Sequence, residues 1–151
     1  LMCGHNEALV ARLRAKRARG GHAVGGFTSD VTRYMHLADY FIGKPGPGCL
    51  SEAVQMGLPV ITFRNAWTMP QERYNTEWVR EKGVGLVLKS LLDLRPAASD
   101  LIDRLPELRA RVRQIDNRAL FELPEILADL LHAGAVPIAT RAASSAATVA
   151  A

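Results

Sequence analysis

The sequence is poor in cysteine, in aromatic residues and in long apolar runs. Its 151 residues include two cysteines, Cys3 and Cys49, whose unlike contexts argue against a disulfide framework and indicate a reducing, cytoplasmic compartment. No apolar stretch approaches the roughly 20 residues that span a bilayer. Aromatic residues make up only 6%, and the basic stretch 12–19 has no aromatic platform for stacking bases, so nucleic acid is not an expected partner.

Several familiar site motifs are also missing. Neither G-x-x-x-x-G-K-[ST] nor G-x-G-x-x-G occurs, which argues against a phosphoryl-transferring P-loop and against the dinucleotide fingerprint. The four histidines and two cysteines show no metal-ligand spacing, so neither a metal nor another cofactor is expected. The formal net charge of +4 favours phosphate-bearing ligands or anionic membrane surfaces without deciding between them.

What the chain does contain is 48% hydrophobic residues, arranged as short apolar runs that alternate with amphipathic stretches. This order predicts βαβ units in an α/β, Rossmann-like fold, with a parallel sheet and flanking helices. The expected strands are Leu1–Gly4, His22–Phe27, Ala38–Gly43, Leu58–Phe63 and Val84–Ser90. The expected helices are Asn6–Arg19, Ser29–Leu37, Gly48–Met56 and Pro70–Lys82.

Past Ser90 the pattern becomes purely helical, and the C-terminal helices should cap the sheet. Residues 98–121 favour one or two helices interrupted near Pro106, and a further helix should begin at Pro124. From Gly134 the chain is Ala, Ser and Thr with almost no charge, which predicts a disordered tail over 134–151 after one domain over 1–133. Because Leu1 opens directly on a strand-like run, we expect the domain to be N-terminally incomplete.

The stretch 41–53, FIGKPGPGCLSEA, follows a predicted strand, where ligands bind in open parallel sheets. Gly46 and Gly48 can adopt unusual backbone angles and let a ligand approach the main chain, while Pro45 and Pro47 hold the loop open. The helix that follows offers unpaired N–H groups and a positive dipole end, which favour a diphosphate. Glu52 lies one helical turn further on, where it can accept hydrogen bonds from ribose hydroxyls. For the turn taken alone, the alternative is an ordinary Gly-Pro loop that binds no phosphate.

A second polar helix start follows the next predicted strand. Pro70 suits the first helical position, and Gln71, Glu72 and Asn75 occupy the opening turns. Adjacent amides and carboxylates at the carboxyl end of a strand suit the hydroxyl groups of a sugar. An ordinary polar helix start, with Glu favoured by the helix dipole, remains open as the alternative.

Three motifs together resemble the C-terminal, donor-binding domain of glycosyltransferase family 28, one half of a GT-B fold. They are LMCGHN, GGFTSDVTRYMHLADYFIGKPGPGCLSEAVQMGLPVI and PQERYN with VREKGVG, and the likeness runs from Leu1 to about Leu131. Within that family the likeness is strongest to the monogalactosyldiacylglycerol synthases and the processive diacylglycerol glucosyltransferases. It is weaker to the N-acetylglucosaminyltransferase that makes lipid II.

The resemblance implies roles for eleven residues. Those expected to bind the substrate are Gly46, Pro47, Gly48 and Cys49 along the diphosphate, Glu52 at the ribose, Gln71 and Glu72 at the sugar with Asn75 behind them, Phe27 by the uracil ring, and Gly4 and Asn6 beside the donor pocket. Two positions depart from the family, because Cys49 stands where Thr or Ser is common and His5 where Arg or Lys is frequent. A thiol is a weak donor, which weakens the expected phosphate contact.

The implied reaction is an inverting transfer from a UDP-hexose to a lipid acceptor such as diacylglycerol, without a metal, with helix N-terminal amides stabilising the departing UDP. The catalytic residues are unknown, because the family's acceptor domain, which supplies the general base, has no counterpart here. The alternative is a nucleotide-sugar-binding subunit or fragment, inactive without a separate acceptor-binding domain. Either should lie in the cytoplasm, with peripheral contact at the inner membrane face. Glucose, galactose and N-acetylglucosamine all remain open.

Overall fold

A computed structural model describes residues 1–16 and 22–133 of the chain. Contacts divide the chain into two compact units, Leu1–Ile115 and Asp116–Ala151. The end of the first expected helix, at 17–19, and the expected disordered tail, 134–151, lie outside the described residues. The predicted domain boundary at 133 therefore stays a prediction.

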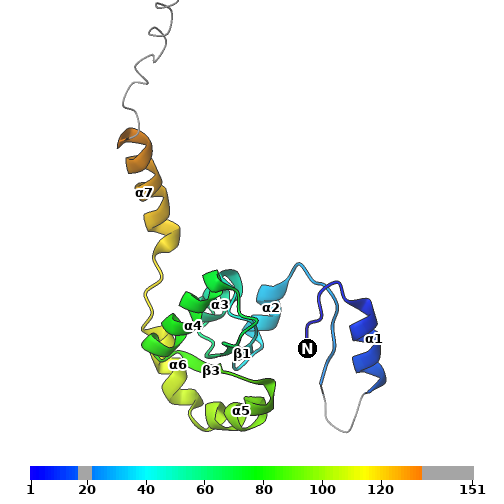
Figure 1. Ribbon diagram of the computed structural model, residues 1–151. Helices are drawn as coiled ribbons and strands as arrows, with labels where there is room; N and C mark the ends of the chain where they lie inside the picture. Colours follow the sequence, from blue (N-terminus) through cyan, green and yellow to red (C-terminus); the bar gives the residue numbers. More distant parts are fainter. Residues whose placement is uncertain (17–21, 134–151) are drawn as a thin grey trace, which may run out of the picture. The chain divides into compact units, whose positions relative to one another are not determined.

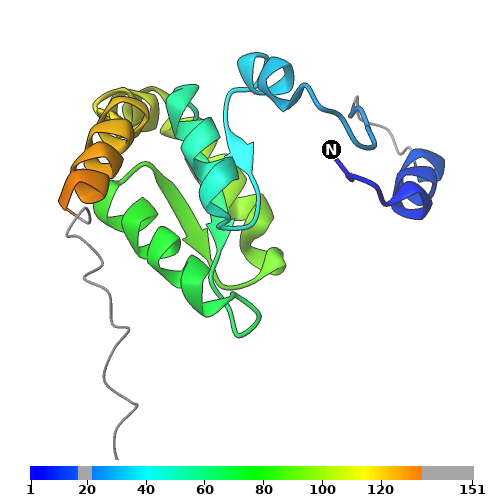
Figure 2. The same cartoon turned by 90° about the horizontal axis from the view of Figure 1, so that it is seen from above.

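The first unit is built on a parallel three-stranded sheet in the order β1-β2-β3. The strands are β1 (Phe41–Ile42), β2 (Val60–Phe63) and β3 (Gly85–Leu88), which pair in parallel through Phe41 with Val60 and Val60 with Gly85. The central strand is buried along most of its length, as expected for a parallel strand with both faces covered. The predicted α/β architecture is confirmed (Figures 1 and 2).

Alternate residues of β2 point into two separate clusters of apolar side chains. Val60 packs in the cluster that holds Leu50 and Val54 of α3 (Pro47–Gln55) and Val79 of α4 (Pro70–Lys82). Ile61 packs with Leu101 and Leu108, from the two helices α5 (Leu94–Asp103) and α6 (Leu105–Arg113). In Figure 1, α4 and α5 accordingly lie on opposite sides of β3.

The first two predicted strands are wrong. Residues 1–4 and 22–27 meet in one isolated parallel bridge between Met2 and Gly25, with Cys3 N donating to Gly25 O at 2.9 Å. Leu1 is 66% exposed and Met2 47%, so no buried strand end exists here. The two short segments pair only with each other, and Gly25 and Gly26 offer no side chain with which to build an apolar face. The helices beside them are α1 (Glu7–Ala15) and α2 (Val31–His36).

The C-terminal helices follow the prediction up to Arg113 and then depart from it. The break between α5 and α6 falls at Arg104, two residues before Pro106. The last helix, α7 (Ala119–Ala133), begins five residues before Pro124 and contains that proline, so the predicted start is wrong. Proline removes one backbone donor from the helix. The first helical turn nevertheless forms before Pro124, where Phe121 N and Glu122 N donate to Arg118 O.

Candidate functional site

The turn between β1 and α3 leaves the start of that helix open. Gly46 is the N-cap and Pro47 occupies the first turn, and no side chain caps the amides that follow. Pro45 and Gly46 are buried, whereas Pro47, Gly48 and Cys49 are exposed. A Cβ atom added at Gly48 would meet nothing within 4 Å. The turn therefore presents free backbone amides and the positive end of a helix to solvent.

The expected use of unusual backbone angles in this turn is wrong. Gly46 has φ −67° and ψ 138°, and Gly48 lies within α3. Positive φ occurs at Gly4, Gly57 and Gly83 among the described residues. The contribution of Gly46 and Gly48 is the absence of side chains, which keeps the main chain accessible.

The start of α4 is tied to this turn by a direct contact. Asn75 Nδ2 donates to the carbonyl oxygen of Pro45 at 2.8 Å. Glu72 reaches the same turn, because its Oε1 lies 3.9 Å from the place that a Cβ of residue 46 would take. An amide and a carboxylate from the second polar helix start thus border the open start of α3. The structure brings Gly46, Glu72 and Asn75 together.

Two other predicted residues stand at the margin of this group. Glu52 is exposed on α3, one turn after Gly48. Gln71 is exposed at the start of α4, where its Nε2 lies 3.7 Å from the sulfur of Met69. Lys44, in the turn itself, is exposed and adds a positive charge. Carboxylates and an amide that flank open amides can accept from hydroxyls while the amides hold an anion.

The loop between β2 and α4 fixes where α4 begins. Asn65 N donates to Thr68 Oγ1 at 3.0 Å, and that hydroxyl donates to Phe63 O at 3.3 Å. Trp67 N donates to Asn65 Oδ1 at 3.0 Å, and Trp67 is 92% exposed at the tip of the loop. Sequence reasoning passed over Trp67, although an Asn and a Thr three residues apart are typical of such a self-bonded loop.

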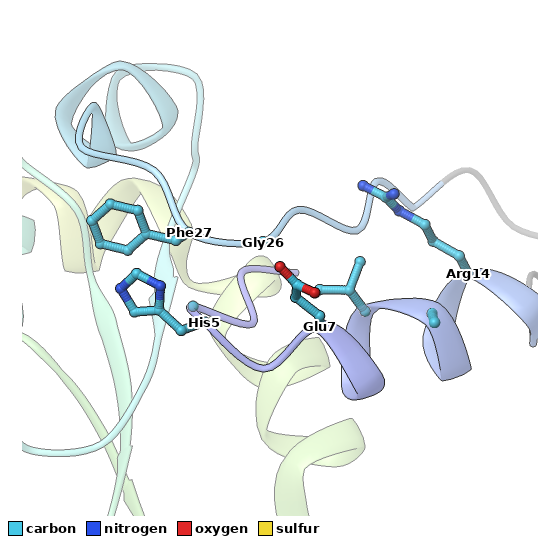
Figure 3. Close-up of a pocket in the computed structure, with 8 residues that line it drawn as sticks. His5, Glu7, Arg14, Gly26 and Phe27 are labelled. Atoms are coloured by element: carbon cyan, nitrogen blue, oxygen red, sulfur yellow. The ribbon is translucent and has the colours of Figure 1, made fainter.

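Three predicted residues belong to a different part of the first unit. Gly4 and Phe27 line a cavity of about 480 Å³, in which the rings of His5 and Phe27 stack with centroids 4.1 Å apart (Figure 3). Glu7 and Arg14 also line this cavity. Asn6 caps α1 instead, because its Oδ1 accepts from Leu9 N at 2.9 Å.

These residues do not join the turn-centred group. Within the described ranges 1–16 and 22–133, no hydrogen bond, ion pair or ring contact links residues 1–29 to the 43–48 turn. Histidine, cysteine and carboxylate side chains of those ranges form no cluster of three that could hold a metal. The substrate roles of all eleven residues, and the absence of a cofactor, stay predictions.

The fold and the site define the chain as a Rossmann-like α/β domain with two polar helix starts in contact at the carboxyl edge of its sheet. The chain is similar to the monogalactosyldiacylglycerol synthases, and the predicted resemblance is confirmed. It is 33% identical to the chloroplastic synthase of Spinacia oleracea over 99 residues, which are 66% of this chain and 19% of that protein. No protein-family model matches the chain.

Two further relatives carry the same name. Monogalactosyldiacylglycerol synthase 3 of Arabidopsis thaliana is 27% identical over 132 residues, 87% of this chain and 27% of that enzyme. The probable synthase of Nicotiana tabacum is 37% identical over 90 residues, 60% of this chain and 16% of that enzyme. The chain thus spans about a quarter or less of the relatives' length. All three names say chloroplastic, and the cytoplasmic location stays a prediction. None of the described helices combines the length and apolar character needed to cross a membrane.

Proposed function

We propose that the chain is the donor-binding part of a glycosyltransferase that takes a hexose from UDP-hexose and passes it, with inversion, to a lipid acceptor such as diacylglycerol. The observation that carries the proposal is the 2.8 Å hydrogen bond from Asn75 to Pro45 O. This bond holds polar side chains that suit sugar hydroxyls against a turn that suits a diphosphate, and the binding of a nucleotide sugar needs both. The names of the relatives support a hexosyl group and a lipid acceptor.

Each residue of the site then has a chemical task. The open amides of Gly48 and Cys49 and the dipole of α3 hold the diphosphate, and Glu52 accepts from the ribose hydroxyls. Glu72 accepts hydrogen bonds from hydroxyl groups of the hexose, and the amide of Gln71 donates to them. In the transfer, the acceptor oxygen bonds to the anomeric carbon as the bond between that carbon and the β-phosphate oxygen breaks. The charge that develops on UDP is stabilised by the same amides, without a metal.

The acceptor site and the general base that takes the acceptor's proton are assigned to another part of the enzyme. The second candidate is a binding subunit whose acceptor domain lies on a separate chain. Both candidates share the donor site. The reading frame upstream of Leu1 distinguishes them, because only the first candidate requires an acceptor domain encoded there.

Calorimetric titration with UDP tests the donor site in the chain as it stands. We expect saturable heat, and we expect Glu52→Ala to weaken binding by roughly 10- to 100-fold, since a hydrogen bond to a charged group contributes about 1.5–3 kcal/mol. Glu81→Ala is the matched control, because Glu81 is an exposed carboxylate near the far end of α4. A folded chain that gives no heat with millimolar UDP, or equal affinities for both variants, would contradict the proposal.

A further inference from the structure

Trp67 is held almost fully exposed by an ordered loop that leads into α4. Within the loop, which spans 64–69, Asn65 N donates to Thr68 Oγ1, Trp67 N donates to Asn65 Oδ1, and Thr68 N donates to Asn65 O at 3.1 Å. Thr68 is 7% exposed and anchors the loop, whereas Trp67 is 92% exposed. Because these hydrogen bonds already order the backbone, little further ordering is needed when a ligand packs against the indole.

A series of short contacts leads from the open turn to this loop. Glu72 Oε1 lies 3.9 Å from the place that a Cβ of residue 46 would take. Gln71, the next residue toward the loop, turns back along it, because its Nε2 lies 3.7 Å from the sulfur of Met69. Trp67 stands two residues before Met69, in the loop that projects past the first turn of α4 (Figure 2). From the turn outward, the order of groups is therefore carboxylate, amide and indole.

This order of groups matches the parts of a hexose. A pyranose ring carries hydroxyl groups around its rim, whereas its faces present C–H groups that are apolar. Carboxylate and amide groups suit the rim, because they accept from hydroxyls and donate to them. An aromatic ring suits a C–H face, since it offers a large flat apolar surface. Sites for small molecules generally combine such aromatic surface with a few placed polar groups. Glu72 and Gln71 supply only the polar groups, and Trp67 supplies the aromatic surface.

We propose that the indole of Trp67 belongs to the donor site and packs against the C–H face of the hexose whose hydroxyl groups Gln71 and Glu72 bind. The inference rests on the proposed function and adds to it a residue that distinguishes a UDP-sugar from UDP. The diphosphate and the ribose are assigned to the start of α3, where Glu52 lies. Affinity for UDP alone should therefore be independent of Trp67, whereas affinity for a UDP-sugar should depend on it.

Calorimetric titration of the full chain with UDP, UDP-glucose, UDP-galactose and UDP-N-acetylglucosamine tests this dependence. We expect Trp67→Ala to weaken binding of the UDP-sugar that binds best by roughly 3- to 10-fold, and to leave the affinity for UDP unchanged. Trp67→Phe should recover most of the loss, because a phenyl ring can pack on the same C–H face. The exposed position of Trp67 means that neither variant removes a side chain from the core.

Tryptophan fluorescence reports the contact directly. The sequence has two tryptophans, and Trp78 packs against the core, so in Trp78→Phe the emission comes from Trp67 alone. We expect the UDP-sugar to change this emission and UDP to leave it unchanged, because only the sugar reaches the indole.

Leu92→Ala is the matched control, because Leu92 is 90% exposed and lies in the loop that follows the neighbouring strand β3. It should bind each UDP-sugar as the unaltered chain does, and an equal loss in this variant overturns the proposal. Unchanged UDP-sugar binding in Trp67→Ala also overturns it, and would leave the indole to a protein partner. Equal losses for UDP and the UDP-sugar overturn it as well. UDP heat with UDP-sugar binding that ignores Trp67 refutes this inference alone, whereas no heat with any of the four ligands refutes the donor site too.

Discussion

At the scale of single residues, Gly85 shows how closely the backbones of β2 and β3 approach. A Cβ atom at this position would overlap the carbonyl oxygen of Val60, a fully buried residue of the central strand. Backbone atoms cannot turn aside as a flexible side chain can. The glycine is therefore required by the pairing of the strands that end at the candidate site.

We expect Gly85→Ala to lower the free energy of unfolding by more than about 2 kcal/mol, because the overlap forces β3 away from β2. Urea unfolding followed by circular dichroism measures this. Gly48→Ala serves as the comparison, since its new methyl group meets nothing within 4 Å. A Gly85→Ala variant as stable as Gly48→Ala would show that the strands separate at little cost.

The residues of the site differ in how far sequence alone could place them. Spacing put Gln71, Glu72 and Asn75 on one helix start, because helical periodicity is local. The contact of Asn75 with Pro45 spans 30 residues of chain and depends on how β1 and β2 pair, which no local pattern specifies. Trp67 was missed because nothing local distinguishes an exposed tryptophan from a core one.

At the scale of elements, one guanidinium joins α5 to α6 at their break. Arg104 lies 3.3 Å from Asp100 of α5 and 3.3 Å from Glu107 of α6, and Arg111 also pairs with Glu107 at 2.9 Å. The hydrogen bond and charge of Arg104, and more weakly Arg111, hold the pKa of Glu107 below its usual value. The pKa of Arg104 is raised in turn, first by Glu107 and then by Asp100.

We expect Arg104→Gln to raise the pKa of Glu107, as measured by carboxyl NMR titration. A depressed pKa in the folded state stabilises the fold above the unfolded-state pKa, and this contribution is lost as the pH falls through the folded-state pKa. The effect on stability should be small and should shrink in high salt, because these groups are exposed to solvent. A titration curve unchanged by Arg104→Gln would mean that the pair does not persist in solution.

Elements with strong local signals were the ones predicted well. The bounds of α4 match the expected helix, because Pro70 starts it and Gly83 ends it in the left-handed conformation with φ 62°. The N-terminal strands failed for a non-local reason. A strand exists only through its partners, and an apolar run such as 1–4 cannot report whether a neighbour is available.

At the scale of the whole molecule, the buried apolar side chains of the described residues lie between Val10 and Val112, inside the first unit. Both clusters beside the sheet are complete by Ile115. In α7 the described side chains, at 121–133, are all exposed, including Phe121 at 68% and Leu131 at 75%. The alternation of apolar runs and amphipathic stretches predicted this sheet, because each βαβ unit is contiguous in sequence. The division at Ile115 was not predicted, because it follows from packing.

A chain that ends at Ile115 should therefore fold as the first unit does in the full chain. We expect its free energy of unfolding in urea to lie within about 0.5 kcal/mol of the full chain's, because both apolar clusters of the first unit are built from residues up to Ile115. Its affinity for UDP by calorimetry should also be unchanged, since the turn at 43–48 and the start of α4 are retained. A large loss of stability on truncation, or a weaker affinity for UDP, would contradict this prediction.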